Sequence, residues 1–268
     1  MVISRSRKAG FFAELTTVIR HIKRVKEEGK LIHINWDKSN SLYFDENYGQ
    51  NVWNYYFDQV DSQTEGHVDY VLDNYIPITT YVNLNIRETF NKVYNDYITL
   101  NQQTKKIIEE NIKIIDKKTL GLHIRKTDKF LGNFFNEPMS LPIDDEIVFK
   151  LIDDKLYEGF EKIYLATDCE ETYNNFSKRY NNTIINVDRI RGINNNTIHT
   201  SNTNDGYRKG LEALIDCYML SKCGFLLRST SNLSSFSMFM NLDLECININ
   251  EIYRNDIREH EFNIYSKI

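Results

Sequence analysis

The sequence of 268 residues has no hydrophobic run long enough to cross a membrane. A spanning helix needs roughly 18 or more consecutive apolar residues, and no segment approaches that length. The first eight residues are basic, but neither an apolar signal core nor a small-residue cleavage site follows them. We therefore expect an intracellular, cytoplasmic protein without an integral membrane segment.

An excess of positive charge is also absent. The chain has 33 Lys and Arg residues against 38 Asp and Glu residues, a net charge of −5. A mildly acidic protein has no bulk attraction for nucleic acid or anionic lipid, so neither is expected as a partner. The four cysteines form no CxxC or CxxH pair, which argues against a structural zinc site.

Several signatures of catalytic sites are missing as well. The sequence contains no Walker lysine loop, no GxGxxG motif and no nucleophile elbow around a serine. It also lacks the DxD strand end of metal-dependent sugar transferases. Asp153 and Asp154 form only a weak metal candidate because they lie on the solvated face of an expected helix. No metal and no other cofactor is therefore expected.

The second half of the chain alternates between short apolar strands and amphipathic helices. This order favours a parallel, doubly wound sheet. Strands are expected at 119–124, 162–166, 183–187, 224–227 and 244–249, and helices at 144–157, 170–180, 205–222 and 232–240.

The first half is less regular. Apolar spacing predicts a helix over 10–28, a strand over 31–36, a short aromatic helix over 51–60 and one long helical region over 86–115. Because the strand at 119–124 follows directly, we place a boundary near Asp116 between an N-terminal lobe, 1–116, and a C-terminal lobe, 117–268.

The most informative stretch is Leu-Gly-Leu-His-Ile-Arg-Lys-Thr-Asp-Lys at 120–129. His123 and Arg125 are two residues apart on the expected strand, so they share a face. Ligands of parallel α/β sheets bind outside the carboxyl ends of the strands, and the planar fork of arginine suits a phosphate. The turn 228–232 also begins a helix, whose open amides attract anions. A phosphate site at this edge is predicted, with a charged turn and an ordinary helix cap as the alternatives.

Four motifs together resemble the fucosyltransferases of the HxRxxD superfamily. The segment 123–129, His-Ile-Arg-Lys-Thr-Asp-Lys, resembles the HxRRTDK strand end of α-1,6-fucosyltransferases and the signature shared with α-1,2- and protein O-fucosyltransferases. The other three matches follow in the same order: 163–168 resembles the YLATD strand, 214–221 the LDxxxLS helix and 225–231 the FLVCTFSS turn.

This resemblance implies a GT-B type α/β fold, with two Rossmann-like lobes that each hold a mostly parallel sheet. It implies an inverting, metal-independent glycosyltransferase that moves fucose from GDP-fucose to an oligosaccharide or polysaccharide acceptor. The N-terminal lobe would face the acceptor and the C-terminal lobe would bind the nucleotide sugar. In an intracellular enzyme, the acceptor would be a glycan assembled in the cytoplasm, as in polysaccharide biosynthesis.

The motif positions also imply roles for individual residues. Arg125 would hold the β-phosphate and would be catalytic together with Asp128 and Lys129. Donor-binding residues would be His123 and Asp216 at the guanosine, Ser229, Ser231 and Asn232 at the diphosphate, and Asp168 at the end of the next strand. The base that takes the acceptor proton would be Asp128, Glu137 or Glu14, while a structural ion pair between Asp128 and Lys129 is an alternative role for those two.

The sequence departs from the family pattern at three positions. Lys126 replaces the second arginine of HxRR, Asn133 replaces an acidic residue, and Leu233 replaces a glutamine. Two further interpretations therefore stay open: a transferase using another nucleotide sugar on the same fold, and a non-catalytic nucleotide-sugar-binding protein. A hydrolase with His123 as nucleophile has no other support in the chain.

Overall fold

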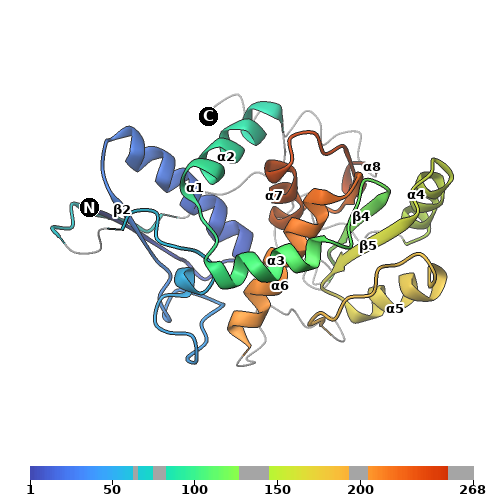
Figure 1. The fold of residues 1–268 in the computed structure, drawn as a ribbon, viewed down its shortest axis with the longest axis horizontal. Coiled ribbons are helices and arrows are strands. Elements are labelled where there is room, and N and C mark those ends of the chain that lie inside the picture. The colour runs from blue at the N-terminus through green and yellow to red at the C-terminus, as the bar shows by residue number, and fades with distance from the viewer. Residues whose placement is uncertain (63–65, 75–82, 127–144, 193–204, 253–268) are drawn as a thin grey trace.

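The computed structural model describes residues 1–62, 66–74, 83–126, 145–192 and 205–252. Two parallel sheets lie at opposite ends of the molecule, with several helices between them (Figure 1). The expected fold class, α/β with a parallel sheet in each of two lobes, is confirmed. Within the described residues, no helix combines the length and apolar character that crossing a membrane requires.

The N-terminal sheet has the strand order β2-β1-β3 and is parallel throughout. Helix α1 (Phe11–Glu27) follows β1 (Val2–Arg5) and leads into β2 (Ile32–Asn35), while β3 is Tyr70–Leu72. The predicted helix and the strand at 31–36 are confirmed, but β1 and β3 were not predicted. Both are very short, and their apolar positions are stabilised by a neighbouring strand rather than by a local pattern.

The C-terminal sheet has the strand order β5-β4-β6-β7 and is also parallel. Its strands are β4 (Thr119–Ile124), β5 (Lys162–Thr167), β6 (Phe225–Arg228) and β7 (Cys246–Asn248). Every residue of β4 is buried, since this strand is paired on both sides. The register places His123 opposite Ala166 on β5 and Arg228 on β6. The ends of these three strands therefore meet at one edge of the sheet.

The two faces of this sheet carry different helices. Alternate residues of β4, among them Leu120 and Leu122, share a core with residues of α4 (Asp145–Tyr157) and α5 (Glu170–Arg179). Gly121 lies on the opposite face, where a Cβ would be 3.1 Å from the Cys223 sulfur. His123 is two residues further along and shares that face. A last short helix, α8 (Ile249–Ile252), follows β7.

The strand predicted at 183–187 is wrong. Only an isolated bridge between Ile184 and Ile163 of β5 is formed there. After this bridge the chain turns toward α6 (Gly206–Lys222), where Glu212 accepts a hydrogen bond from the backbone N–H of Ile190 at 2.8 Å. That contact competes with continued pairing along β5, and no residue pattern within 183–187 reveals it.

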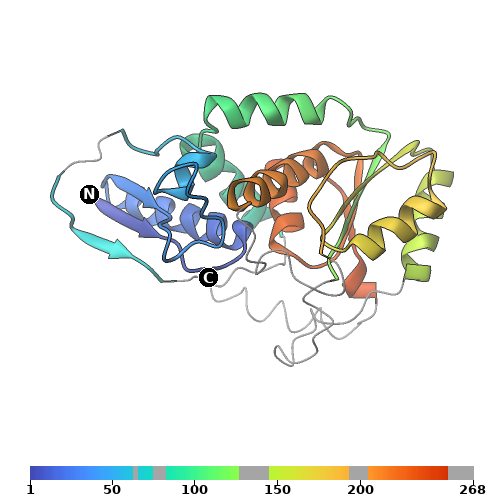
Figure 2. The same cartoon turned by 90° about the horizontal axis from the view of Figure 1, so that it is seen from below.

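The single helical region predicted over 86–115 is also wrong, because it forms two helices, α2 (Leu84–Tyr97) and α3 (Gln102–Ile112). Leu100 in the break makes an antiparallel bridge with Phe57. The Asn101 side chain then caps α3 by accepting from the N–H of Thr104 at 2.9 Å. The predicted aromatic helix shortens to a 3₁₀ turn, η1 (Val52–Tyr55). Helix α3 packs on α6 (Figure 2).

Helices α6 and α7 (Asn232–Met240) also pack on the N-terminal part of the chain. Phe236 of α7 lies 5.0 Å from Phe12 of α1 between ring centroids. The Tyr56 hydroxyl donates to the carbonyl of Tyr207 at 3.0 Å. Arg87 of α2 donates to backbone carbonyls at the end of α7, including that of Asn241 at 2.7 Å. One continuous core therefore fixes the N-terminal sheet relative to α6 and α7.

Candidate functional site

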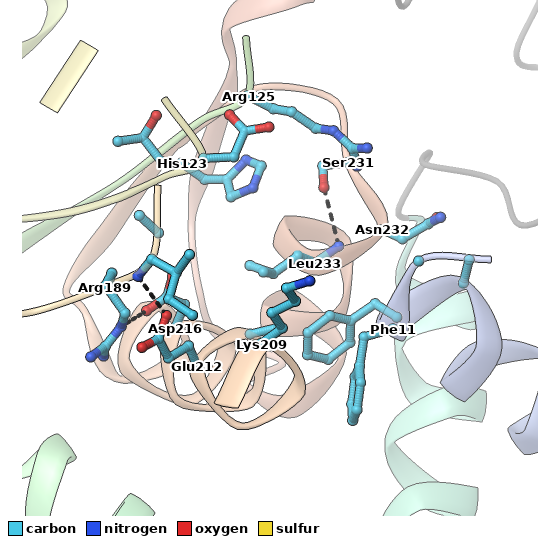
Figure 3. A pocket seen from close by; sticks show the side chains of 18 of the residues that line it. Phe11, His123, Arg125, Arg189, Lys209, Glu212, Asp216, Ser231, Asn232 and Leu233 are labelled. Carbon is cyan, nitrogen blue, oxygen red and sulfur yellow. Dashed lines mark hydrogen bonds and ion pairs between the residues drawn. The ribbon is translucent and has the colours of Figure 1, made fainter. Parts of the chain in front are cut away.

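A cavity of about 320 Å³ lies between the N-terminus of α1 and the carboxyl edge of the C-terminal sheet (Figure 3). One face of α6, the N-terminus of α7 and the loop at 189–190 complete its wall. The lining side chains that could bind a ligand or take part in a reaction are His123, Arg125, Asp168, Arg189, Lys209, Glu212, Asp216, Ser231 and Asn232. Five of these nine were predicted at the donor site beside Arg125, and the structure brings all of them to one cavity.

The end of β4 is fixed by the predicted residue Ser229. Its buried hydroxyl lies 3.0 Å from Nδ1 of His123 and accepts from the backbone N–H of Arg125 at 3.0 Å. The N–H of Ser229 donates to the carbonyl of His123 at 2.8 Å. This serine therefore holds the backbone from which Arg125 extends into the cavity (Figure 3).

His123 is a neutral imidazole at physiological pH. Burial and the positive charges of Arg125 and Arg228 lower its pKa to about 3. A neutral ring donates from only one of its two nitrogens. His123 therefore contributes a hydrogen-bonding group to the cavity without contributing a charge.

The N-terminus of α7 forms the wall beside Arg125. Ser231 caps this helix, with its hydroxyl accepting from the N–H of Leu233 at 3.2 Å. The preceding turn is fixed by Asn250, which accepts from the N–H of Thr230 at 2.7 Å. Because helix N-termini carry partial positive charge and open N–H groups, this wall and Arg125 create one region suited to an anion.

The opposite wall holds the predicted residue Asp216 in a polar cluster. Its Oδ1 accepts from Nε of Arg189 at 2.7 Å and from the hydroxyl of Tyr164 at 2.6 Å. The Arg189 and Asp216 side chains are only 10% and 15% exposed. The carboxylate that the sequence places on an apolar helix thus has two partners from other elements, and it still lines the cavity.

Three polar lining residues were not predicted: Arg189, Lys209 and Glu212. Lys209, Glu212 and Asp216 are spaced three and four residues apart on α6, so they share a helix face. That spacing is visible in the sequence and could have identified Lys209 and Glu212. Arg189 comes from a loop and carries no comparable local signal.

Asp168 and Lys126 lie at the ends of neighbouring strands. Asp168 lines the cavity, and its Oδ1 accepts from the backbone N–H of Lys126 at 3.1 Å. The Lys126 ammonium donates to Oδ1 of Asp145 at 2.5 Å, at the start of α4. In the described part of the chain, no group of three or more His, Cys, Asp or Glu side chains is arranged to hold a metal ion.

The residues proposed for the base have different placements. Glu14 is buried near the cavity, and its Oε1 accepts from the N–H groups of Arg7 at 2.7 Å and Ala9 at 2.9 Å. Burial raises the pKa of this carboxyl group. Glu14 therefore fixes the loop before α1. Asp128, Lys129 and Glu137 lie outside the described residues.

The lowered pKa of His123 predicts a stability difference with pH. The unfolded imidazole has a pKa near 6.5, against about 3 when folded, so the unfolded state binds more protons between these values. The contribution of His123 to the free energy of unfolding is therefore fully present above about pH 6.5 and is lost as the pH decreases. His21, with a pKa lowered to about 4, acts in the same direction. Between pH 6.5 and 5, His123 should account for about 2 kcal/mol.

Urea denaturation at pH 7 and pH 5 tests this prediction in the wild type and in His123→Asn. The wild-type free energy of unfolding should fall more steeply on acidification than that of the variant, which keeps the contributions of His21 and His33, whose pKa values burial also lowers. Parallel losses in the two proteins would contradict it.

No protein-family model matches the chain, and no curated protein matches it in sequence. Solved structures do resemble it. NodZ α-1,6-fucosyltransferase soaked with GDP-fucose is 17% identical with a TM-score of 0.57, over 90% of this chain and 92% of NodZ. A second structure of NodZ, from Bradyrhizobium, is 15% identical with a TM-score of 0.59 over the same shares.

A structure of POFUT1 in complex with GDP is 8% identical to the chain. Its TM-score is 0.51, and the match covers 92% of this chain and 98% of that one. At such low identities the similarity is one of fold. The resemblance predicted from the four ordered motifs is thus confirmed at that level, and the chain has the two-lobe, GT-B type fold of these fucosyltransferases.

Proposed function

We propose that this protein is an inverting glycosyltransferase that moves fucose from GDP-fucose to a glycan acceptor. The observation that carries the proposal is the convergence of Arg125 and the N-terminus of α7 on one cavity wall. Similarity to NodZ soaked with GDP-fucose and to POFUT1 with GDP supports the choice of donor. The four ordered motifs of the sequence point to the same donor.

The reaction breaks the bond between C1 of the sugar and an oxygen of the β-phosphate. Negative charge grows on that phosphate, and Arg125 and the α7 amides stabilise it from fixed positions. The acceptor hydroxyl forms the new bond to C1 from the opposite face, which inverts the configuration. A base takes the hydroxyl proton. Because Oε1 of Glu14 already accepts two backbone N–H groups, we favour Asp128 or Glu137 for this role.

We assign the guanine to the wall that contains Asp216. A carboxylate accepts hydrogen bonds from the N1 and N2 donors of guanine, and uracil lacks this pair of donors. Arg189 and Tyr164 both donate to Oδ1 of Asp216 and hold the carboxylate in a fixed orientation. His123, which is neutral, would add a hydrogen bond to the guanosine moiety.

Donor turnover tests the proposed function directly. The purified protein is incubated with GDP-fucose, other GDP-sugars, UDP-sugars and dTDP-sugars, and hydrolysis of each is measured. We expect turnover with GDP-fucose, and thermal stabilisation by GDP but not by UDP or dTDP. Stabilisation by UDP or dTDP instead would favour the same fold with another donor. If the protein binds the donor but shows no turnover, either alone or with added glycan acceptors, a non-catalytic binding protein would be favoured.

We also predict that turnover does not require a divalent metal. In metal-dependent transferases the cation neutralises the leaving diphosphate, and here Arg125 and the α7 N-terminus are positioned for that work. Rates in excess EDTA should equal those with added manganese. Activity that disappears in EDTA and returns with manganese would overturn this mechanism and direct attention to Asp168, Asp153 and Asp154.

A further inference from the structure

The two adjacent cations at the end of β4 have different surroundings. Arg125 lines the cavity. Lys126 forms a 2.5 Å ion pair with Asp145, and the two side chains are only 12% and 24% exposed. Contact between Lys126 and a ligand in the cavity would require breaking a mostly buried pair, which is costly. Of these two cations, Arg125 lines the cavity and Lys126 does not.

Another cation enters from α6. Lys209 lines the cavity and is 6% exposed. Figure 3 shows its ammonium group between Leu233 at the start of α7 and Phe11 at the start of α1. Lys209, Arg125 and the first residues of α7 therefore line the same cavity.

The position of Lys209 is set by close packing of α6 on the N-terminal lobe. At the next residue, Gly210, a Cβ would lie 2.2 Å from the Tyr56 hydroxyl oxygen and 3.1 Å from Cε2 of Phe11. Only glycine allows this approach. The backbone that carries Lys209 is consequently fixed against the element that forms the facing cavity wall.

The charges around Lys209 favour an anion in the cavity. Burial lowers the pKa of its ammonium group, although Asp205 partly opposes this effect. On the same face of α6, Glu212 accepts from Nε of Arg208 at 2.6 Å, and Asp216 accepts from Nε of Arg189 at 2.7 Å. Each of these carboxylates is paired with an arginine, which weakens its repulsion of an anion in the cavity. A buried ammonium group is stabilised by an anion that binds beside it.

We propose that Lys209 is a donor-binding residue that contacts the diphosphate of the nucleotide sugar together with Arg125. This inference rests on the proposed function, because it takes the anion in the cavity to be that diphosphate. The three N–H donors of an ammonium group can contact non-bridging oxygens without the planar geometry of arginine. Lys209 thereby supplies the second positive charge that Lys126 does not bring to the cavity.

Isothermal titration with guanosine, GDP and GDP-fucose tests this role in the wild type, Lys209→Met, Lys209→Gln and Lys209→Arg. Both neutral variants should bind GDP and GDP-fucose roughly 10- to 100-fold more weakly, because a charge-assisted contact is lost. Guanosine should bind as in the wild type, and Lys209→Arg should keep most of the GDP affinity. Thermal unfolding confirms that each variant is folded, and the two neutral side chains provide independent measurements.

Lys126→Met is the matched control, since it removes the adjacent strand-end cation instead. Its ratio of GDP affinity to guanosine affinity should stay within about threefold of the wild-type ratio. A change of that size is about what one neutral hydrogen bond contributes, and is smaller than the loss of a charge-assisted contact. The proposal is overturned if that ratio falls in Lys126→Met but not in the Lys209 variants. It is equally overturned if the Lys209 variants lose guanosine and GDP affinity alike, or lose affinity for GDP-fucose alone.

The wild-type titration separates this inference from the function on which it rests. A wild type that binds GDP, with unchanged affinity in both neutral variants, overturns the role of Lys209 and leaves the proposed function intact. A wild type that binds no guanine nucleotide overturns the proposed function and the role of Lys209 together.

Discussion

Replacing Arg125 with alanine should lower the kcat for donor turnover by roughly 10²- to 10³-fold, or about 3–4 kcal/mol of transition-state stabilisation. Arg125 extends from the end of a fully buried strand, and its backbone N–H is held by Ser229 at 3.0 Å. The backbone that carries Arg125 is thus fixed before the reaction begins, which limits the reorganisation needed as charge develops on the leaving phosphate. The KM for the donor should change less than kcat, because the charge on the phosphate is greatest in the transition state.

Three comparisons make the Arg125 experiment specific. Arg125→Lys should rescue little activity, because it keeps the charge but loses the planar pair of donors. Arg24→Ala removes an arginine from an exposed position on α1, where it pairs with Glu28 at 3.1 Å, and should leave turnover unchanged. Unfolding temperatures should be similar in all these proteins. Near-wild-type turnover in Arg125→Ala would overturn the proposed phosphate site.

Replacing Asp216 with alanine should reduce both stability and guanine-nucleotide affinity. The change leaves Arg189 and the fully buried Tyr164 hydroxyl without their shared acceptor. Breaking a buried ion pair from one side costs about 3–5 kcal/mol. Since the Arg189 and Asp216 side chains are 10% and 15% exposed, we expect a loss of about 3 kcal/mol in the free energy of unfolding, at the lower end of that range. Urea denaturation measures it.

The two roles of Asp216 can be separated by combining substitutions. Asp216→Asn keeps an oxygen acceptor and should lose less stability than Asp216→Ala. Adding Arg189→Met to Asp216→Ala removes the buried arginine that has lost its carboxylate partner. This double variant should recover part of the stability, but not the affinity for GDP. If GDP affinity returns as well, Asp216 serves only to hold Arg189. An unchanged dissociation constant for GDP in Asp216→Ala would also make Asp216 purely structural.

Much of the C-terminal sheet could be predicted from sequence because its signals are local. The strand at 119–124 is a short, wholly buried apolar run, and its predicted bounds coincide with those of β4. The helices on either side have regular apolar spacing, and their predicted ends fall within one residue of the observed ends. Since parallel strands place their carboxyl ends at one edge, His123, Arg125 and Ser231 could be assigned to a shared site without coordinates.

The errors fall where a distant partner decides the local conformation. Strands β1 and β3 are held by pairing with each other. The break between α2 and α3 follows from the bridge of Leu100 to Phe57. No window of neighbouring residues contains these partners, so local periodicity missed both strands and predicted a continuous helix where there are two.

By itself, the sequence determined the parallel α/β class, the fucosyltransferase-like order of motifs and the strand end that carries Arg125. Only the tertiary structure decided which charges face the cavity. It turns Lys126 toward Asp145, ties Asp216 to Arg189 and brings Lys209 into the cavity that the start of α7 also lines. The physical reason is that a charged side chain takes its role from the partners within a few ångströms, because Coulomb attraction and hydrogen bonding are short-ranged in water. Those partners come from elements far apart in the chain.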